Sequence, residues 1–237
     1  GRLNPGALFI LEGRVRMAHT AILVDGGFYR KRAAHLWGKK SAEDRAKELN
    51  AYCLAHLRDK DGVEARQLYR IFYYDCEPIG HRSVYHPLTK KNVDLDKSDT
   101  YAWTLTFLNE LRRRRKFALR LGELSNQACY NLRPEITRKL MAGSLSVQDL
   151  KEEDFMFVAQ QKGVDMRIGI DISSLAYKKQ VNQIILISGD SDFVPAAKLA
   201  RREGIDFILD PMWADIKADL FEHIDGLNSQ WKKKESQ

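Results

Sequence analysis

The stretch that decides the fold is residues 183–209, which read QIILISGDSDFVPAAKLARREGIDFIL. Its first part, Gln183–Ser188, centres on an unbroken apolar run and has the length of a strand. Val194–Arg202 reads as a helix that ends in basic residues, with Gly204 just beyond it as a stop signal. Asp206–Leu209 is a second apolar strand. This order predicts parallel strands that are buried on both faces.

The same alternation of strand and helix continues through the rest of the chain. It predicts an α/β fold of three layers with a mainly parallel central sheet. Working outward from 183–209, we expect strands at 20–25, 68–74, 117–124 and 155–159, and helices at 28–37, 42–57, 99–115, 165–177 and 214–222.

Most of the chain is expected to form one domain, over residues 17–228. A middle segment at about 77–154, in which Pro, Gly, His and charged residues interrupt the pattern, is expected to be an insertion. Residues 1–16 precede Met17 and resemble a vector-derived or linker leader, with a genuine N-terminal arm as the alternative. Residues 229–237 are expected to be a basic C-terminal tail.

Composition narrows the class of protein without naming a function. The 237 residues include 39 Lys and Arg against 32 Asp and Glu, and this surplus favours a polyanionic partner. A hydrophobic content of 44% excludes wholesale disorder, and three widely spaced cysteines exclude a disulfide framework. No apolar run approaches the length of a membrane span. We therefore expect a cytoplasmic protein that has no membrane partner.

Five aspartates fall where an open α/β sheet binds its ligands, outside the carboxyl ends of the strands. Their convergence would be costly without a cation, because neighbouring carboxylates repel one another. Hard oxygen ligands without His or Cys favour Mg²⁺ or Mn²⁺, and such an ion supports the hydrolysis of phosphodiesters or phosphomonoesters. The five are Asp25 after the first strand, Asp190 and Asp192 after the strand at 183–188, and Asp165 and Asp171 in the helix before that strand.

Some of these acids also admit a purely structural role. Asp192 and Asp165 each stand where a residue would cap a helix. Asp171 follows Asp165 by six residues, about 240° around a regular helix, so both face one ion only if Asp165 lies before the first helical turn. Asp25 precedes Gly26 and Gly27 at a strand end, and no comparable structural role is expected for it.

Three segments then resemble a known family. VDGGF at 24–28, KGVDMRIGID at 162–171 and SGDSDFVP at 188–195 are similar, in the same order, to motifs of NYN domains, the LabA-like family of PIN-like nucleases. The resemblance implies a PIN-like fold and a metal-dependent site that acts on RNA. It implies Asp25, Asp165, Asp171 and Asp190 as catalytic metal ligands, with Asp192 as a catalytic support. Phe28 departs from the pattern, because many members carry Asn there.

Several other residues are candidates for contact with the substrate. Lys162 and Arg167 flank Asp165, and Ser188 and Ser191 flank Asp190. The densest basic run, at 112–116, includes Arg112 and Arg113, and such a run binds phosphates. A solvated helix end is an equally good reading of that run, since basic residues complement the helix dipole at a C-terminus.

The leading hypothesis is a metal-dependent endoribonuclease that hydrolyses single-stranded or structured RNA. One alternative is a catalytically weak RNA-binding or assembly module on the same fold. Another is a haloacid-dehalogenase-type phosphatase, but those enzymes need a second Asp where this chain has Gly27. A homodimer is left open as a further partner.

Overall fold

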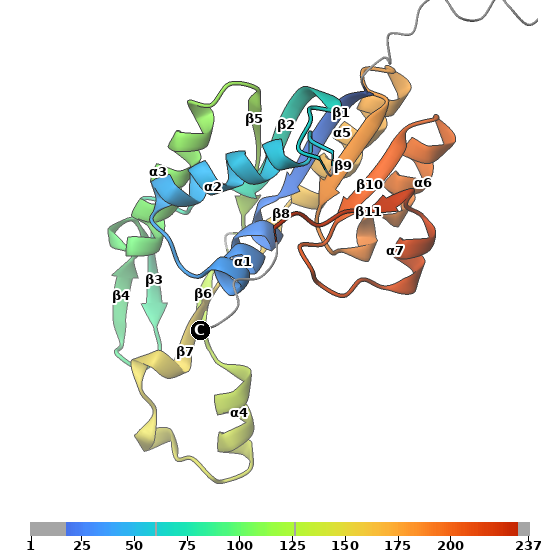
Figure 1. Cartoon of the computed structure of the whole chain (residues 1–237). Helices are drawn as coiled ribbons and strands as arrows, with labels where there is room; N and C mark the ends of the chain where they lie inside the picture. Colours follow the sequence, from blue (N-terminus) through green and yellow to red (C-terminus); the bar gives the residue numbers. More distant parts are fainter. Residues whose placement is uncertain (1–17, 60, 126, 232–237) are drawn as a thin grey trace, which may run out of the picture.

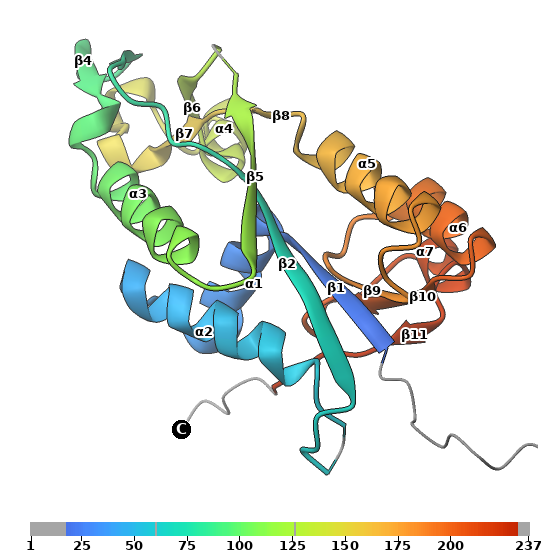
Figure 2. The same cartoon turned by 90° about the horizontal axis from the view of Figure 1, so that it is seen from above.

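The central sheet occupies the middle of the molecule. The computed structural model describes residues 18–59, 61–125 and 127–231. Its main sheet has seven strands in the order β11-β10-β9-β1-β2-β5-β8. Strands β11 to β5 run parallel, whereas β8 pairs antiparallel with β5 (Figures 1 and 2). The strands are β1 (Ala18–Asp25), β2 (Arg66–Cys76), β5 (Phe117–Leu124), β8 (Gln161–Lys162), β9 (Gln183–Ile187), β10 (Asp206–Asp210) and β11 (Gly226–Leu227).

Helices cover both faces of this sheet, as Figure 2 shows. Three helices bury one set of side chains against one face, and three others bury a second set against the opposite face. The expected three-layer α/β fold with a mainly parallel sheet is therefore confirmed. The first group is α1 (Gly26–Trp37), α2 (Ala42–Ala55) and α3 (Asp99–Arg112), and the second is α5 (Val164–Tyr177), α6 (Val194–Arg202) and α7 (Ala218–Glu222).

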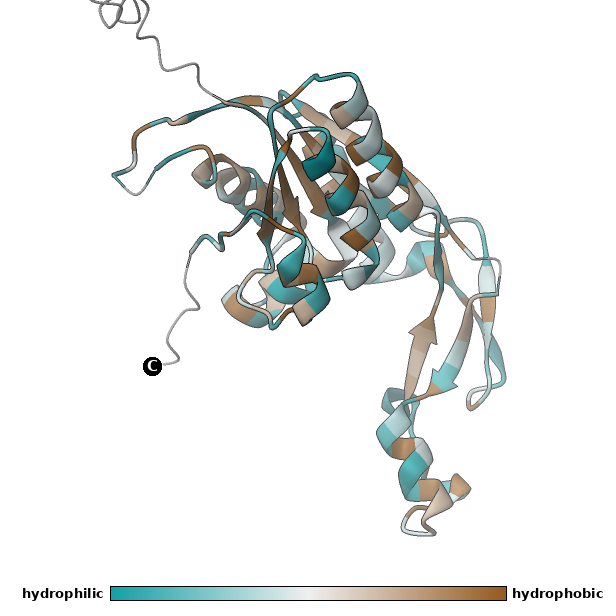
Figure 3. Cartoon of the chain, turned by 90° about the vertical axis from the view of Figure 1, so that its right-hand side faces the viewer, coloured by the Kyte–Doolittle hydropathy of each residue, from teal (hydrophilic) through white to brown (hydrophobic). Residues whose placement is uncertain are grey.

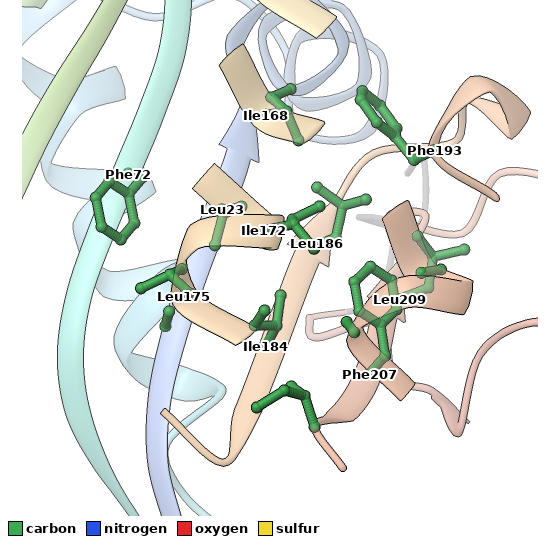
Figure 4. Close-up of a cluster of buried hydrophobic side chains, with 14 of the residues drawn as sticks. Leu23, Phe72, Ile168, Ile172, Leu175, Ile184, Leu186, Phe193, Phe207 and Leu209 are labelled. Atoms are coloured by element: carbon green, nitrogen blue, oxygen red, sulfur yellow. The ribbon is translucent and has the colours of Figure 1, made fainter. Parts of the chain in front are cut away.

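Strand β9 explains why the quoted stretch governs the fold. All five of its residues are buried. Ile184 and Leu186 belong to the core beneath α5 and α6 (Figure 4), whereas Ile185 and Ile187 belong to the core beneath α1 to α3. Side chains alternate between the two faces of a strand, so only a strand that is apolar throughout supplies both cores. Burial of each such side chain contributes about 1.5–3 kcal/mol.

A second body, which we call the lateral lobe, comprises residues 79–98 and 127–158 and projects beside the sheet (Figures 1 and 3). The ring of His86 joins its two ribbons, with ring centroids 4.6 Å from Tyr130 and 4.9 Å from Phe155. The lobe contains β3 (Ser83–His86), β4 (Lys91–Asp94), η1 (Leu95–Lys97), β6 (Cys129–Leu132), α4 (Pro134–Met141), η2 (Val147–Asp149), η3 (Glu152–Asp154) and β7 (Phe155–Val158).

The segment at 77–154, expected as one insertion, is divided in the structure. Helix α3 packs against α2, and β5 pairs with β2 in the main sheet, so residues 99–124 are part of the sheet and its helical layer. The strand expected at 155–159 lies in the lateral lobe, where β7 pairs with β6. The sequence of so short a strand does not indicate to which sheet the strand belongs. The remaining expected domain limits stay predictions, and residues 1–16 lie outside the described residues.

Two helix boundaries matter for the functional site. Helix α1 begins at Gly26, directly after Asp25, and α5 begins at Val164, one residue before Asp165. A Cβ on Gly26 would lie 2.4 Å from the Tyr73 hydroxyl, so this close approach of helix to sheet requires glycine. No helix within the described residues is long and apolar enough to cross a membrane.

Candidate active site

The carboxyl ends of β1 and β9 bring four acidic residues to one edge of the sheet. Val24 pairs with Ile187, so the residues that follow them, Asp25 and Ser188, are neighbours. The Ser188 hydroxyl donates a hydrogen bond to Asp25 Oδ2 at 3.3 Å. The turn after β9 and the first turn of α5 supply the other members. We call the set the acidic group: Asp25, Asp165, Asp190 and Asp192.

Asp25 has a structural role as well as its place in the acidic group. Its Oδ1 accepts a hydrogen bond from the backbone N–H of Phe28 at 3.0 Å, so Asp25 is the N-cap of α1. The sequence offered no such role, because the helix was expected to begin only at Phe28. Burial raises the pKa of Asp25 against the opposing effect of this hydrogen bond, and the charge of Asp165 raises it further.

The turn that follows β9 is held by its own side chains. Ser188 Oγ accepts from the Asp190 N–H at 3.3 Å, and Asp190 Oδ1 accepts from the Asp192 N–H at 3.0 Å. Asp190 therefore caps the short helix η4 (Ser191–Phe193). A Cβ on Gly189 would lie 2.9 Å from the Phe28 ring, so any other residue here would displace that ring. Phe28, which replaces the Asn of many NYN motifs, thus packs against the turn of the acidic group.

Asp165 lies in the first turn of α5 and is exposed. Desolvation raises the pKa of its carboxyl, and the charges of Asp190 and Asp192 raise it further. The N-cap of α5 is Gly163, with a φ of 76°, and the N-cap of α6 is Phe193. The capping roles considered for Asp165 and Asp192 are therefore wrong.

Asp171 does not join the acidic group. Asp165 is already inside the helix, so Asp171 points to a different side of α5. Its carboxylate accepts hydrogen bonds from the Tyr74 hydroxyl at 2.8 Å and from Arg120 Nε at 3.0 Å. This arrangement corrects the expectation that Asp171 faces the same ion as Asp165.

The carboxylates of the acidic group lie farther apart than the ligands of a formed metal site. Across residues 18–59, 61–125 and 127–231, no three His, Cys, Asp or Glu side chains lie close enough together to hold a metal ion. The electrostatic couplings nevertheless form a chain from Asp25 through Asp165 to Asp190 and Asp192. The donor set consists of carboxylates alone, which suits a hard cation.

A fifth acid, Asp75, was missed by the sequence analysis. It is the penultimate residue of β2, its side chain is 1% exposed, and its charge also raises the pKa of Asp25. Arg30 forms an ion pair with Asp75 Oδ1 at 3.0 Å, and the Tyr73 hydroxyl donates to Asp75 Oδ2 at 2.8 Å. Gln161 Nε2 also donates to Asp75, at 3.2 Å. The missed signal was an acid directly after an apolar strand, the same pattern that identified Asp25.

The candidate substrate residues near Asp165 and Asp190 have different surroundings. Lys162 is exposed on the edge strand β8, where it pairs with Glu123 in the backbone register. Arg167 is half-buried, and its Nε is buried without a hydrogen-bond partner in the part of the chain that is described. Ser191 Oγ accepts from Lys217 Nζ at 3.0 Å, which brings a further cation to the turn after β9.

Arg112 and Arg113 lie apart from the acidic group. They end α3 and lead into the amino end of β5, whereas the acidic group lies at the carboxyl edge of the sheet. Arg112 pairs with Glu77 at 2.9 Å and Arg113 with Glu110 at 3.0 Å. This geometry favours the solvated helix end over a phosphate contact at the acidic group.

Asp165 and Asp192 line a hollow of about 570 Å³ between α5 and α6. Two further hollows lie on the α1 side of the acidic group. The first, of about 820 Å³, lies between α1 and α3 and begins at Gly27, two residues after Asp25. A second of about 410 Å³ lies between the sheet edge and the lateral lobe, with Asp75 and Arg30 in its wall and the rings of Tyr101 and Tyr130 beside them. A ligand at the carboxyl edge would therefore have concave surface on the α1 side of Asp25.

The family model described as NYN domain matches residues 85–219, more than half of the chain. A solved structure of a protein of unknown function from Vibrio parahaemolyticus RIMD 2210633 is similar, with 14% identity, a TM-score of 0.48, and coverage of 92% of this chain and 96% of that chain. No curated protein matches. The chain belongs to the NYN domain family, a family of PIN-like nucleases.

Proposed function

We propose that the protein is a metal-dependent endoribonuclease that hydrolyses RNA phosphodiester bonds at the acidic group. The observation that carries the proposal is the electrostatic coupling of four aspartates at the carboxyl edge of an NYN fold. The charge of Asp165 raises the pKa of Asp25, and the charges of Asp190 and Asp192 raise that of Asp165. Such mutual repulsion is costly in a site that binds nothing, and a divalent cation relieves it.

The residues present fit Mg²⁺ or Mn²⁺ by their chemistry. Asp25, Asp165 and Asp190 would hold the ion, with Asp192 beside them, because carboxylate oxygens are its preferred protein ligands. When bound, such an ion lowers the pKa of a coordinated water and neutralises charge on the phosphate. Asp165 and Asp192 are exposed, so their side chains can rotate towards a cation, and Asp190 is exposed beside them with its Oδ1 engaged in the cap of η4.

Other residues of the chain would position the substrate. The Ser188 hydroxyl holds Asp25 Oδ2 and orients that carboxylate towards the sheet edge. Lys162 and Arg167 flank Asp165 in the chain and supply positive charge for a phosphate next to the acidic group. Lys217, fixed by Ser191, supplies a further cation on the side of α7.

A second candidate function is an RNA-binding or assembly module with weak catalysis. It is favoured by the spacing of the acids, since no three of them within the described segments lie within reach of one ion. On this reading the positive residues bind phosphates and the acidic group is a remnant of the family site.

One experiment separates the two functions. Labelled single-stranded RNA and a generic phosphomonoester are incubated with the protein in Mn²⁺, Mg²⁺ or EDTA. We expect RNA cleavage that needs the metal and is reduced at least about 100-fold in Asp25→Asn and Asp190→Asn. The matched control is Asp61→Asn, an exposed acid in the loop before β2. Persistent cleavage in both site variants would overturn the site, and RNA retention without cleavage would favour the binding module.

Metal binding is measured separately, because loss of activity has several causes. Titration of the protein with Mn²⁺ alone is expected to raise its melting temperature, since a ligand that binds the native state stabilises it. This rise should disappear in Asp190→Asn and persist in Asp61→Asn. An equal rise in both variants would place the ion elsewhere on the protein.

A further inference from the structure

The groove between α1 and α3 continues the carboxyl edge of the sheet away from the acidic group. Gly27, Arg30, Lys31 and Ala34 stand at helical spacings of three and four, so they form one face of α1, and this face lines the groove of about 820 Å³. Its inner end adjoins Asp25, because a Cβ on Gly27 would lie 3.5 Å from Asp25 Oδ1. The inner end of the groove therefore lies beside Asp25, although none of the four aspartates of the acidic group lines it.

The outer end of the groove carries an aromatic platform. Trp103 of α3 lines both this groove and a neighbouring hollow of about 290 Å³, and Arg30 and Ala34 also line both. The Trp103 ring stacks on Phe107 at a centroid distance of 5.1 Å and an interplanar angle of 12°. Its Nε1 donates to the Lys40 carbonyl at 3.0 Å. The indole is thus held in one orientation beside the two hollows.

Positive charge accompanies this platform. Lys39 and Lys40 line the outer hollow and Lys31 lines the groove. Lys40 pairs with Glu48 at 2.6 Å, but Lys31 and Lys39 are exposed and have no carboxylate partner within the described residues. Asp99, at the start of α3, is an acidic residue in the opposite wall of the groove. Lys31 on α1 and Lys39 in the loop after α1 are therefore available to phosphate groups.

We propose that this groove and the outer hollow beside it bind single-stranded RNA, with phosphates on Lys31 and Lys39 and an unpaired base stacked on Trp103. The proposal rests on the ribonuclease function above and names its substrate class. A base can stack on a side chain only when it is unpaired, and aromatic platforms with basic neighbours are the usual means of holding single strands. The strand would then run along α1 to the acidic group, where its backbone meets Asp25.

The test measures binding without cleavage. A fluorescein-labelled oligouridylate of about twelve nucleotides, alone or in a duplex, is titrated with the protein in EDTA. We expect preference for the single strand, binding weakened about 5-fold or more by Trp103→Leu, and near-normal binding by Trp103→Phe, which keeps an aromatic face. Tyr177→Ala, an exposed aromatic on the opposite helical layer, is the matched control.

Salt dependence tests the lysines. The double variant Lys31→Ala with Lys39→Ala should lower the slope of log affinity against log salt by about 1.4, since each single-strand phosphate contact contributes about 0.7. The control is Lys178→Ala with Lys198→Ala, which removes the same charge from the opposite face. Equal losses in the two double variants would overturn the path along α1.

A readout within the protein guards against misfolded variants. Stacking of a base on Trp103 should quench tryptophan fluorescence in the native chain, and Trp103→Phe should lose that quenching while it still binds. Unchanged quenching in Trp103→Phe, or unchanged affinity in Trp103→Leu, overturns the proposal. If the native protein cleaves RNA but the Trp103 variants give either of these results, only the groove proposal is wrong. If the variants bind as expected but the native protein does not cleave RNA, only the ribonuclease function is wrong.

Discussion

Asp25 and Asp210 occupy equivalent places, each at the carboxyl end of a parallel strand of the same sheet, but their surroundings differ completely. Asp210 is fully buried, and its Oδ2 accepts from the Tyr52 hydroxyl at 2.6 Å and from His56 Nε2 at 2.8 Å. Asp25 has one backbone donor, one long bond from Ser188, and acidic neighbours.

The difference shows that an acid at a strand end is a candidate ligand-binding residue only when the protein supplies too few hydrogen-bond donors to satisfy its charge. Asp210 also accepts from the Met212 N–H at 2.7 Å, so its charge is satisfied within the protein. Burial and Asp210 together raise the pKa of Tyr52, which therefore stays a neutral donor. At Asp25 the charges of Asp165 and Asp75 raise the pKa. Arg30 is coupled to Asp25 but forms its ion pair with Asp75, so Asp25 has no cation of its own within the described residues.

Removal of Asp210 should have the largest effect. In Asp210→Ala, the Tyr52 hydroxyl, His56 Nε2 and the Met212 N–H lose their buried acceptor, which costs about 3–5 kcal/mol. Urea unfolding monitored by circular dichroism measures the loss. The control is Asp190→Ala at an exposed turn, where the loss should be within about 1 kcal/mol. Similar losses of unfolding free energy in Asp210→Ala and Asp190→Ala would mean that the buried hydrogen bonds of Asp210 do not distinguish it from the acidic group.

Removal of Asp75 should have the next largest effect on stability, because Asp75 combines features of Asp210 and Asp25. It is as buried as Asp210, yet its partner Arg30 is partly exposed and keeps access to water. Asp75→Ala should cost about 2–3 kcal/mol, because the Tyr73 hydroxyl and the Cys76 N–H lose their acceptor. Urea unfolding again measures this. A loss below that of Asp190→Ala would mean that Asp75 belongs functionally with the acidic group.

The sequence predicted the sheet better than the site. Apolar strands that alternate with helices are sufficient to predict the parallel layers, because burial on both faces leaves a clear signal. Asp75 was missed although it directly follows the strand expected at 68–74; in the structure β2 extends two residues further, to Cys76, and Asp75 lies within it. Asp171 was wrongly joined with Asp165 because the start of α5 decides which way each points, and helix starts are poorly marked where Gly163 is the N-cap.

The lateral lobe was beyond prediction for a different reason. Strands β3, β4, β6 and β7 have four residues each, too few to establish a periodic pattern. Their pairing depends on contacts between distant segments, such as the rings of His86 and Phe155, and no local propensity reports these. The residues that line the α1–α3 groove were likewise invisible, because Lys31 and Trp103 meet only in the folded chain.

Asp25→Asn should have a smaller effect on stability that depends on pH. The folded pKa of Asp25 is raised, chiefly by burial and then by Asp165, so the carboxylate opposes folding above that pKa. The cost disappears as the pH falls below the unfolded value of about 3.9. Asparagine still caps a helix, so the variant should gain stability relative to the native protein as the pH rises from about 4 to 8.

Unfolding free energies of both proteins across this pH range, without divalent metal, test the prediction. A difference in unfolding free energy that stays constant with pH would mean that the charge of Asp25 does not destabilise the fold. Addition of Mn²⁺ should reverse the order at pH 8, because only the native carboxylate binds the cation. Asp25→Ala, which also loses the cap, should be less stable than Asp25→Asn by about 1 kcal/mol at every pH.

The smallest effect is expected at Arg120, and it decides how far the acidic group extends. The Arg120–Asp171 pair is partly exposed, and the guanidinium also lies 5.1 Å from the centre of the Phe72 ring. Arg120→Ala should therefore cost about 1 kcal/mol or less in urea unfolding. Asp171 would remain bonded to the Tyr74 hydroxyl, so RNA cleavage should be unchanged in Arg120→Ala and in Asp171→Asn. A loss in Asp171→Asn as large as that in Asp25→Asn would restore Asp171 to the acidic group and require α5 to turn when metal binds.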